Sequence, residues 1–142
     1  MVSLTEGQIW GSYCTGTLIT PTVVLTAAHC LEDLTQPADV EIFFGSDISR
    51  AGTFVPVQEY LIHPDYDDLD IVDDLGLIRL AEAAPAGVTP IPALPAAQGL
   101  TAADNGGAVE FSGFGLTEDG TDGVRLFVAG TIEEVCPGPD AC

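Results

Sequence analysis

Apolar and β-branched residues occur along the chain in short runs separated by residues that favour turns. Such runs predict strands, and a helical period is absent apart from single turns at residues 27–31 and 32–34. The first two runs flank a Thr-Pro-Thr turn and predict a hairpin. In the first 80 residues, the predicted strands are 12–19, 23–26, 40–44, 54–62 and 75–80. Their intervals favour a sandwich or barrel, so this part is predicted to be an all-β unit.

The composition shifts to alanine, proline and glycine between residues 81 and 107. Proline has no N–H to donate, so a regular strand ladder is not expected around Pro85, Pro90, Pro92 and Pro95. The composition alone fits a covalent linker or a long surface loop on one domain. Beyond it, residues 109–113 and 125–132 predict two further strands around a turn-rich segment. These strands begin a second β unit.

Charge is the extreme feature of this chain of 142 residues. Twenty-two acidic residues against three arginines give a formal net charge of −19, while 46% of the residues are hydrophobic. The apolar content predicts a folded domain rather than a disordered acidic tail. The negative charge excludes a nucleic-acid partner, which needs a basic patch. Membrane insertion is not expected, because no apolar run approaches 18 residues, and residues 1–10 lack the features of a secretory signal.

Four cysteines, an even number, allow two disulfides in any of three pairings: Cys14, Cys30, Cys136 and Cys142. Their spacing does not resemble that of a zinc site, which usually brings ligands in close pairs. Disulfides would favour an oxidising compartment. The alternative from the residues alone is four reduced, buried thiols.

The candidate chemistry centres on His29, which follows a predicted strand and two alanines. A histidine beside an apolar strand is commonly structural. Here, however, Cys-Thr-Gly-Thr-Leu-Ile at 14–19 and Val-Val-Leu-Thr-Ala-Ala-His-Cys at 23–30 resemble the trypsin-like (chymotrypsin-family) serine endopeptidases in residue type, order and spacing. The resemblance implies that His29 is a general base and that Cys14 is bridged to Cys30. Such a bridge would stabilise the fold by about 3 kcal/mol and fix the imidazole.

Six aspartates occur between residues 65 and 74, and Asp74 is the favoured partner of His29. It immediately precedes an apolar strand and follows His29 by 45 residues, a spacing typical of the family. There its carboxylate could accept the Nδ1 proton and orient the ring. Asp73 is the fallback. The alternative for the remaining carboxylates is a calcium site, although the spacing is not that of an EF-hand loop: Asp65, Asp67, Asp68 and Asp70.

Three further segments extend the resemblance. His-Pro-Asp-Tyr at 63–66 resembles the family's His-Pro-x-Tyr, which makes His63 structural, and residues 74–80 resemble its Asp-Ile-Ala-Leu-Leu-x-Leu. Residues 109–115 resemble the segment that opens the family's second barrel, with Phe114 at the usual Trp position. The implied fold is an all-β, chymotrypsin-like double β-barrel. The expected domains are a largely present first barrel at 1–80, a crossover at 81–108 and a truncated second barrel at 109–142.

The family's nucleophile segment, Gly-Asp-Ser-Gly-Gly-Pro, does not occur in these residues. None of the serines has glycines placed to form an oxyanion hole: Ser3, Ser12, Ser46, Ser49 and Ser112. Cys136 and Cys142 lack such surroundings as well. The family's activation terminus, Ile-Val-Gly-Gly, is also missing, and residues 1–4 resemble the strand that follows it. The 142 residues are therefore expected to be inactive by themselves.

The function implied by the resemblance is that of a secreted serine endopeptidase acting on polypeptides without a cofactor or metal. Its nucleophilic serine would lie in the missing C-terminal portion of the same protease. That portion would be the partner of this chain in catalysis. The alternative is a complete, non-catalytic binding or adhesion module on the protease scaffold. The histidine and aspartate favour the first, because a scaffold without catalysis has no physical need of the pair.

Overall fold

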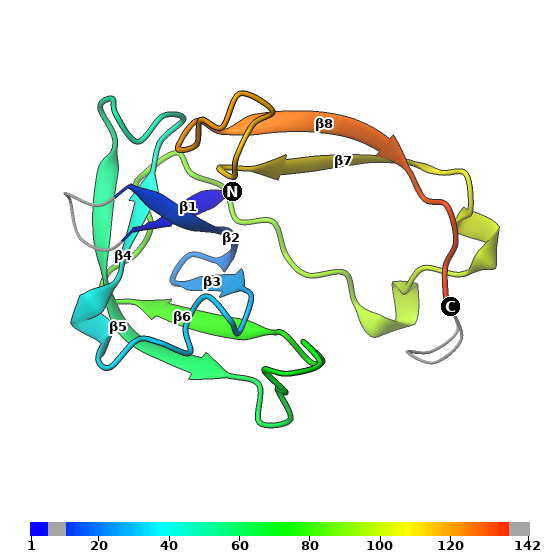
Figure 1. Cartoon of the computed structure of the whole chain (residues 1–142), viewed down its shortest axis with the longest axis horizontal. Coiled ribbons are helices and arrows are strands. Elements are labelled where there is room, and N and C mark those ends of the chain that lie inside the picture. The colour runs from blue at the N-terminus through cyan, green and yellow to red at the C-terminus, as the bar shows by residue number, and fades with distance from the viewer. Residues whose placement is uncertain (6–10, 137–142) are drawn as a thin grey trace. The chain divides into compact units, whose positions relative to one another are not determined.

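The computed structural model describes residues 1–5 and 11–136 (Figure 1). In this described part, the elements are eight strands and three short 3-10 helices. The strands are β1 (Val2–Thr5), β2 (Ser12–Thr20), β3 (Val23–Thr26), β4 (Glu41–Phe44), β5 (Thr53–Ile62), β6 (Gly76–Leu80), β7 (Ala108–Gly113) and β8 (Leu126–Thr131). The 3-10 helices are η2 (Pro37–Asp39), η3 (Ala96–Gln98) and η4 (Ala102–Asp104). The all-β prediction is confirmed.

Six strands close into an antiparallel barrel in the order β1-β2-β3-β6-β5-β4, with β4 pairing back to β1. The predicted hairpin is confirmed as β2 and β3, which pair Thr17 with Leu25. β7 and β8 form a separate two-stranded sheet. One closed barrel with a small second sheet is consistent with a chymotrypsin-like fold of which one barrel is present. Within the described residues, no helix is long and apolar enough to span a bilayer.

The barrel encloses an apolar core. Along β6, Gly76, Ile78 and Leu80 are buried while Leu77 and Arg79 are exposed, the alternation expected when successive side chains point to opposite faces. Thirteen residues form the core cluster: Val2, Leu4, Leu18, Val24, Cys30, Leu31, Val40, Ile42, Phe44, Val55, Val57, Ile78 and Leu80. All of them lie between residues 1 and 80, the range predicted for the first barrel.

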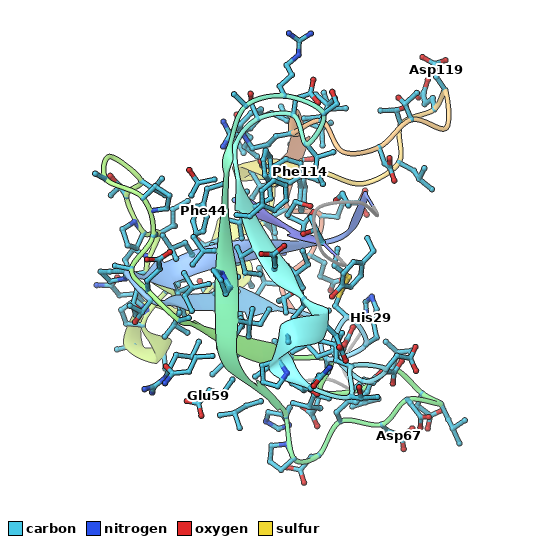
Figure 2. All side chains as sticks on the ribbon, turned by 90° about the vertical axis from the view of Figure 1, so that its left-hand side faces the viewer. His29, Phe44, Glu59, Asp67, Phe114 and Asp119 are labelled. Carbon is cyan, nitrogen blue, oxygen red and sulfur yellow. A yellow bond between two sulfur atoms is a disulfide. The ribbon has the colours of Figure 1, made fainter. Side chains whose placement is uncertain are left out.

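The chain divides into two compact units: Met1–Pro92 with Gly113–Arg125, and Ala93–Ser112 with Leu126–Cys142. In the first unit, Phe114 is fully buried and packs edge-on against Phe43, with 6.4 Å between ring centroids. Its backbone N–H donates to the Thr15 hydroxyl at 2.9 Å. The segment that carries Phe114 is therefore fixed to the barrel (Figure 2).

Candidate active site

The barrel brings two distant segments together at one edge. β3 ends at Thr26 and β6 begins at Gly76, and these two residues face each other in the antiparallel ladder. The turn that follows β3 and the loop that precedes β6 therefore emerge side by side. The turn carries His29 and the loop carries Asp74.

Gly76 allows these segments to approach closely. A Cβ atom at this position would lie 2.6 Å from Cδ1 of Leu31 and 2.9 Å from the Ala27 carbonyl oxygen. The turn itself is fixed by i to i+3 backbone hydrogen bonds from Leu31 to Ala28 and from Leu34 to Leu31. The single turns predicted at 27–31 and 32–34 are thus present, and they place the His29 backbone over the start of β6.

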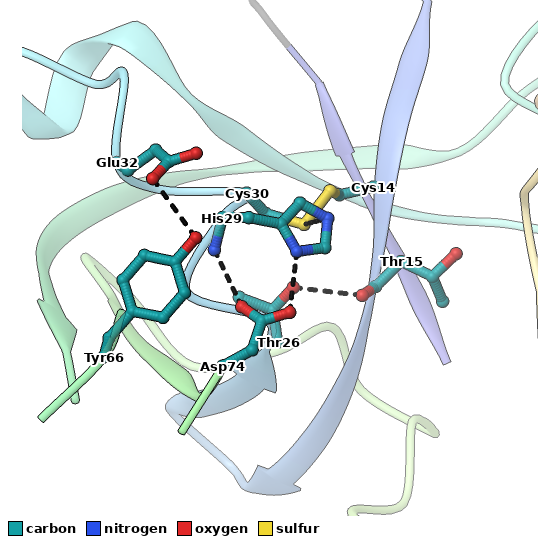
Figure 3. Close-up of polar contacts among 8 residues, drawn as sticks. All are labelled: Cys14, Thr15, Thr26, His29, Cys30, Glu32, Tyr66 and Asp74. Carbon is teal, nitrogen blue, oxygen red and sulfur yellow. Dashed lines mark hydrogen bonds and ion pairs between the residues drawn. A yellow bond between two sulfur atoms is a disulfide. The ribbon is translucent and has the colours of Figure 1, made fainter. Parts of the chain in front are cut away.

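His29 makes two hydrogen bonds to one carboxylate (Figure 3). Its backbone N–H donates to Oδ1 of Asp74 at 2.9 Å, and its Nδ1 lies 2.7 Å from Oδ2. A carboxylate accepts hydrogen bonds, so the neutral imidazole must carry its proton on Nδ1. Nε2 is then left unprotonated. The His29 side chain is 51% exposed and that of Asp74 is 21% exposed, so the ring is accessible while the carboxylate is largely covered.

The surroundings of Asp74 hold its pKa below the ordinary value for an aspartate. Desolvation acts in the opposite direction and raises the pKa. The backbone and ring hydrogen bonds from His29, the charge of that ring when protonated, and the backbone N–H of Ala28 outweigh it. Asp74 therefore stays ionised at neutral pH, the state in which it can orient the imidazole.

Cys14 and Cys30 form a disulfide, the pairing that the resemblance implied. The bridge ties β2 to the residue that follows His29, and Sγ of Cys30 lies 3.6 Å from Nε2 of the ring. The Thr26 hydroxyl adds a second tie to β2 by donating to the Thr15 carbonyl at 3.1 Å. The sequence leaves the pairing of Cys136 and Cys142 open, and Cys142 lies outside the described residues.

Comparison with known proteins identifies the fold family. The sequence model of the family described as Trypsin matches residues 1–134. The chain belongs to the trypsin family. Its similar relatives include coagulation factor XII of Sus scrofa, which is 30% identical in an alignment of 130 residues that covers 84% of this chain and 21% of that protein. Ovochymase of Halocynthia roretzi is 32% identical over 80% of this chain and 7% of that protein. Trypsin of Saccharopolyspora erythraea is 34% identical over 81% of this chain and 48% of that protein.

This chain therefore spans less than half the length of each of these trypsin-family relatives. Three serine hydroxyls are hydrogen-bonded elsewhere, whereas the buried hydroxyl of Ser112 has no hydrogen-bond partner among the described residues. Ser3 donates to Ser12 at 2.7 Å, and Ser49 donates to Asp47 at 2.6 Å. Ser112 belongs to β7, as the sequence predicted. His29 and Asp74 thus form a hydrogen-bonded pair. Within the described residues, no serine hydroxyl is hydrogen-bonded to Nε2 of His29.

The loop of residues 65–74 uses its carboxylates to shape its own backbone. Oδ1 of Asp67 accepts hydrogen bonds from the backbone N–H groups of Leu69 at 2.9 Å and Asp70 at 3.1 Å. Ile71 and Asp73 have left-handed φ values of 52° and 53°, which turn the chain towards Asp74. Asp74, not the fallback Asp73, contacts His29. Within the described residues, the aspartates predicted as an alternative calcium site do not gather their oxygens around one point.

A second link joins the two segments and was not anticipated from the sequence. The Tyr66 hydroxyl donates to Oε2 of Glu32 at 3.2 Å, which connects the aspartate-rich loop to the turn after His29 (Figure 3). Desolvation and then the hydrogen bond and charge of Glu32 raise the pKa of Tyr66 to about 12. In the sequence, Tyr66 stands out only as the last residue of His-Pro-Asp-Tyr. Nothing in the sequence pairs residues that lie 34 positions apart.

Proposed function

We propose that this chain supplies the general base of a serine endopeptidase, with His29 as the base and Asp74 as its orienting partner. The observation that carries the proposal is the double hydrogen bond between His29 and Asp74 in a chain of the trypsin family. The bond to Nδ1 leaves Nε2 unprotonated, and the half-exposed ring can be reached by a nucleophile. Substrates of this activity are polypeptides.

In the proposed reaction, Nε2 removes the proton from an attacking serine hydroxyl as the serine oxygen bonds to the scissile carbonyl carbon. The ionised Asp74 stabilises the imidazolium that results. Collapse of the tetrahedral intermediate transfers that proton from Nε2 to the leaving amine and forms an acyl-enzyme. Water then hydrolyses the acyl-enzyme through a second tetrahedral intermediate by the same acid–base cycle. His29 therefore acts as base and acid in turn.

The attacking serine, in this proposal, lies outside the 142 residues. No Gly-Asp-Ser-Gly-Gly-Pro segment occurs among them. We assign residues 1–80 to the first barrel, 81–108 to the crossover and 109–142 to the first part of a second barrel. The six barrel strands all fall between Val2 and Leu80, which supports the first boundary. The partner of this chain is the C-terminal portion of the same protease, and the chain alone is inactive.

The proposal places the protein outside the cell. The Cys14–Cys30 disulfide supports this location, because structural disulfides persist in oxidising compartments. The strong negative charge suits a protein that stays soluble at high ionic strength.

The test is the reading frame that follows Cys142 in the native gene, together with fluorophosphonate labelling of its full product. The proposal predicts a Gly-Asp-Ser-Gly-Gly segment downstream and stoichiometric labelling that His29→Ala abolishes and His63→Ala does not. The 142 residues alone should not be labelled. A frame that ends at Cys142 would overturn the proposal in favour of a non-catalytic binding or adhesion module.

A further inference from the structure

We propose that reduction of the Cys14–Cys30 disulfide turns the surroundings of His29 into a zinc-binding site. One ligand atom from each of Cys14, His29 and Cys30 lies within 4.8 Å of the other two. Thiolate sulfur and imidazole nitrogen are ligands that Zn²⁺ prefers. While the disulfide is intact the two sulfurs are bonded to each other, so the site does not exist in the oxidised chain.

One of the distances between ligand atoms already matches that of a tetrahedral site. With metal bonds of about 2.3 Å to sulfur and 2.0–2.1 Å to nitrogen, a sulfur and a nitrogen on one Zn²⁺ lie roughly 3.6 Å apart. Sγ of Cys30 and Nε2 of His29 are 3.6 Å apart. The two sulfurs must separate, to roughly 3.8 Å, once their bond is broken. Cys14 is half-buried and His29 is exposed, so the metal can enter from the histidine side.

Asp74 prepares His29 for this role. Metal-binding histidines usually donate their second ring N–H to a carboxylate, which fixes the tautomer and makes the ligating nitrogen more basic. The 2.7 Å contact between Nδ1 and Asp74 provides this arrangement and leaves Nε2 unprotonated, 3.6 Å from Sγ of Cys30. Three protein ligands leave the fourth position for water. The net charge of −19 raises the local concentration of cations.

The chemical steps balance with a dithiol as the reductant. The dithiol gives two electrons and two protons to the Cys14–Cys30 bond and becomes a disulfide itself, and the cysteines become thiols. Zn²⁺ then displaces the two thiol protons and binds two thiolates and a neutral imidazole. In the proposed function, on which the next consequence rests, His29 is the general base. A metal bound to Nε2 prevents that nitrogen from accepting a proton. Reduction would then switch the site from base to metal ligand.

The experiment uses the 142-residue chain with Cys136→Ser and Cys142→Ser, so that the other two cysteines cannot hold metal. A phosphine reduces the remaining disulfide and is itself oxidised to the phosphine oxide with an oxygen atom from water. Co²⁺ serves as the spectroscopic probe. We expect one equivalent of Co²⁺ to bind with a thiolate-to-cobalt charge-transfer band, and Zn²⁺ to displace it. The unreduced chain should show no such band.

Matched variants separate this site from incidental thiol binding. We expect Asp74→Asn to weaken binding by about 10–100-fold, His29→Gln to weaken it at least as much, and His63→Gln to leave it unchanged. Equal affinity of the reduced chain and its His29→Gln variant would overturn the proposal. Loss of the β-sheet circular dichroism on reduction, before metal is added, would also overturn it. Because the readout is metal binding, a failure here is distinguishable from a failure of the proteolytic function.

Discussion

The backbone N–H and the ring of His29 both donate to the carboxylate of Asp74, at 2.9 and 2.7 Å. One side chain therefore fixes the position of the histidine main chain and the tautomer of its ring. The two residues are 45 positions apart and meet because Thr26 and Gly76 face each other in the β3–β6 ladder. The barrel's register is thus what assembles the pair.

The lowered pKa of Asp74 predicts a pH-dependent contribution to stability. A carboxyl group whose pKa is lower in the folded than in the unfolded state stabilises the fold above its unfolded pKa of about 3.9. This contribution is lost as the pH falls through the lower, folded pKa. Urea denaturation of wild type and Asp74→Asn should show a gap of about 1 kcal/mol or less at pH ~7, given the exposure of the pair, and the gap should close at acid pH.

Asp70→Asn is the matched control for this measurement. Asp70 belongs to the same loop and is exposed, so Asp70→Asn should have the same unfolding free energy as the wild type at both pH values. A gap for Asp74→Asn that stays constant between neutral and acid pH would contradict the assigned ionisation.

The Cys14–Cys30 bridge predicts a large loss of stability when it is removed. It links residues 16 positions apart, and the chain-entropy model gives about 3 kcal/mol for a loop of this size. Cys14→Ser with Cys30→Ser should lower the unfolding free energy by about that amount in urea titrations without a reductant. If the double variant were as stable as the wild type, the bridge would not constrain the unfolded chain in the expected way.

The alternation of buried and exposed side chains along β6 predicts that two neighbouring substitutions lower the unfolding free energy by unequal amounts. Ile78 is fully buried in the barrel, whereas Leu77 is 39% exposed on its outer face. Ile78→Ala should cost about 2–5 kcal/mol through lost burial and the cavity that remains. Leu77→Ala should cost about 1 kcal/mol or less. Equal costs in denaturant titrations would mean that the interior face of β6 has been assigned incorrectly.

The link between Tyr66 and Glu32 predicts a change in the titration of Tyr66. The phenol has a pKa of about 12, and the hydrogen bond and charge of Glu32 follow desolvation as causes. Glu32→Gln removes the charge, so the pKa of Tyr66 should fall towards its ordinary value of about 10. Ultraviolet difference titration against Tyr66→Phe isolates this group, and an unchanged pKa would show that Glu32 does not act on Tyr66.

Much of the barrel could be predicted from the sequence, because its strands alternate apolar and polar residues between clear turn signals. The predicted run at 54–62 and the observed β5, Thr53–Ile62, differ by one residue. The residues of η2, η3 and η4 were not predicted, since three-residue turns carry no periodic signal. His29 and Asp74 were found by their spacing and by the resemblance to a known family. Glu32 was missed, because its contact depends on how two loops fold against each other.

The measurement that tests the central claim most directly is nuclear magnetic resonance of the His29 ring at neutral pH, compared between the wild type and Asp74→Asn. The account predicts a ring proton on Nδ1 with a strongly downfield signal, an unprotonated Nε2, and loss of that downfield signal in the variant. A proton on Nε2 in the wild type, or a ring spectrum that Asp74→Asn leaves unchanged, would contradict the claim that Asp74 prepares His29 as a base.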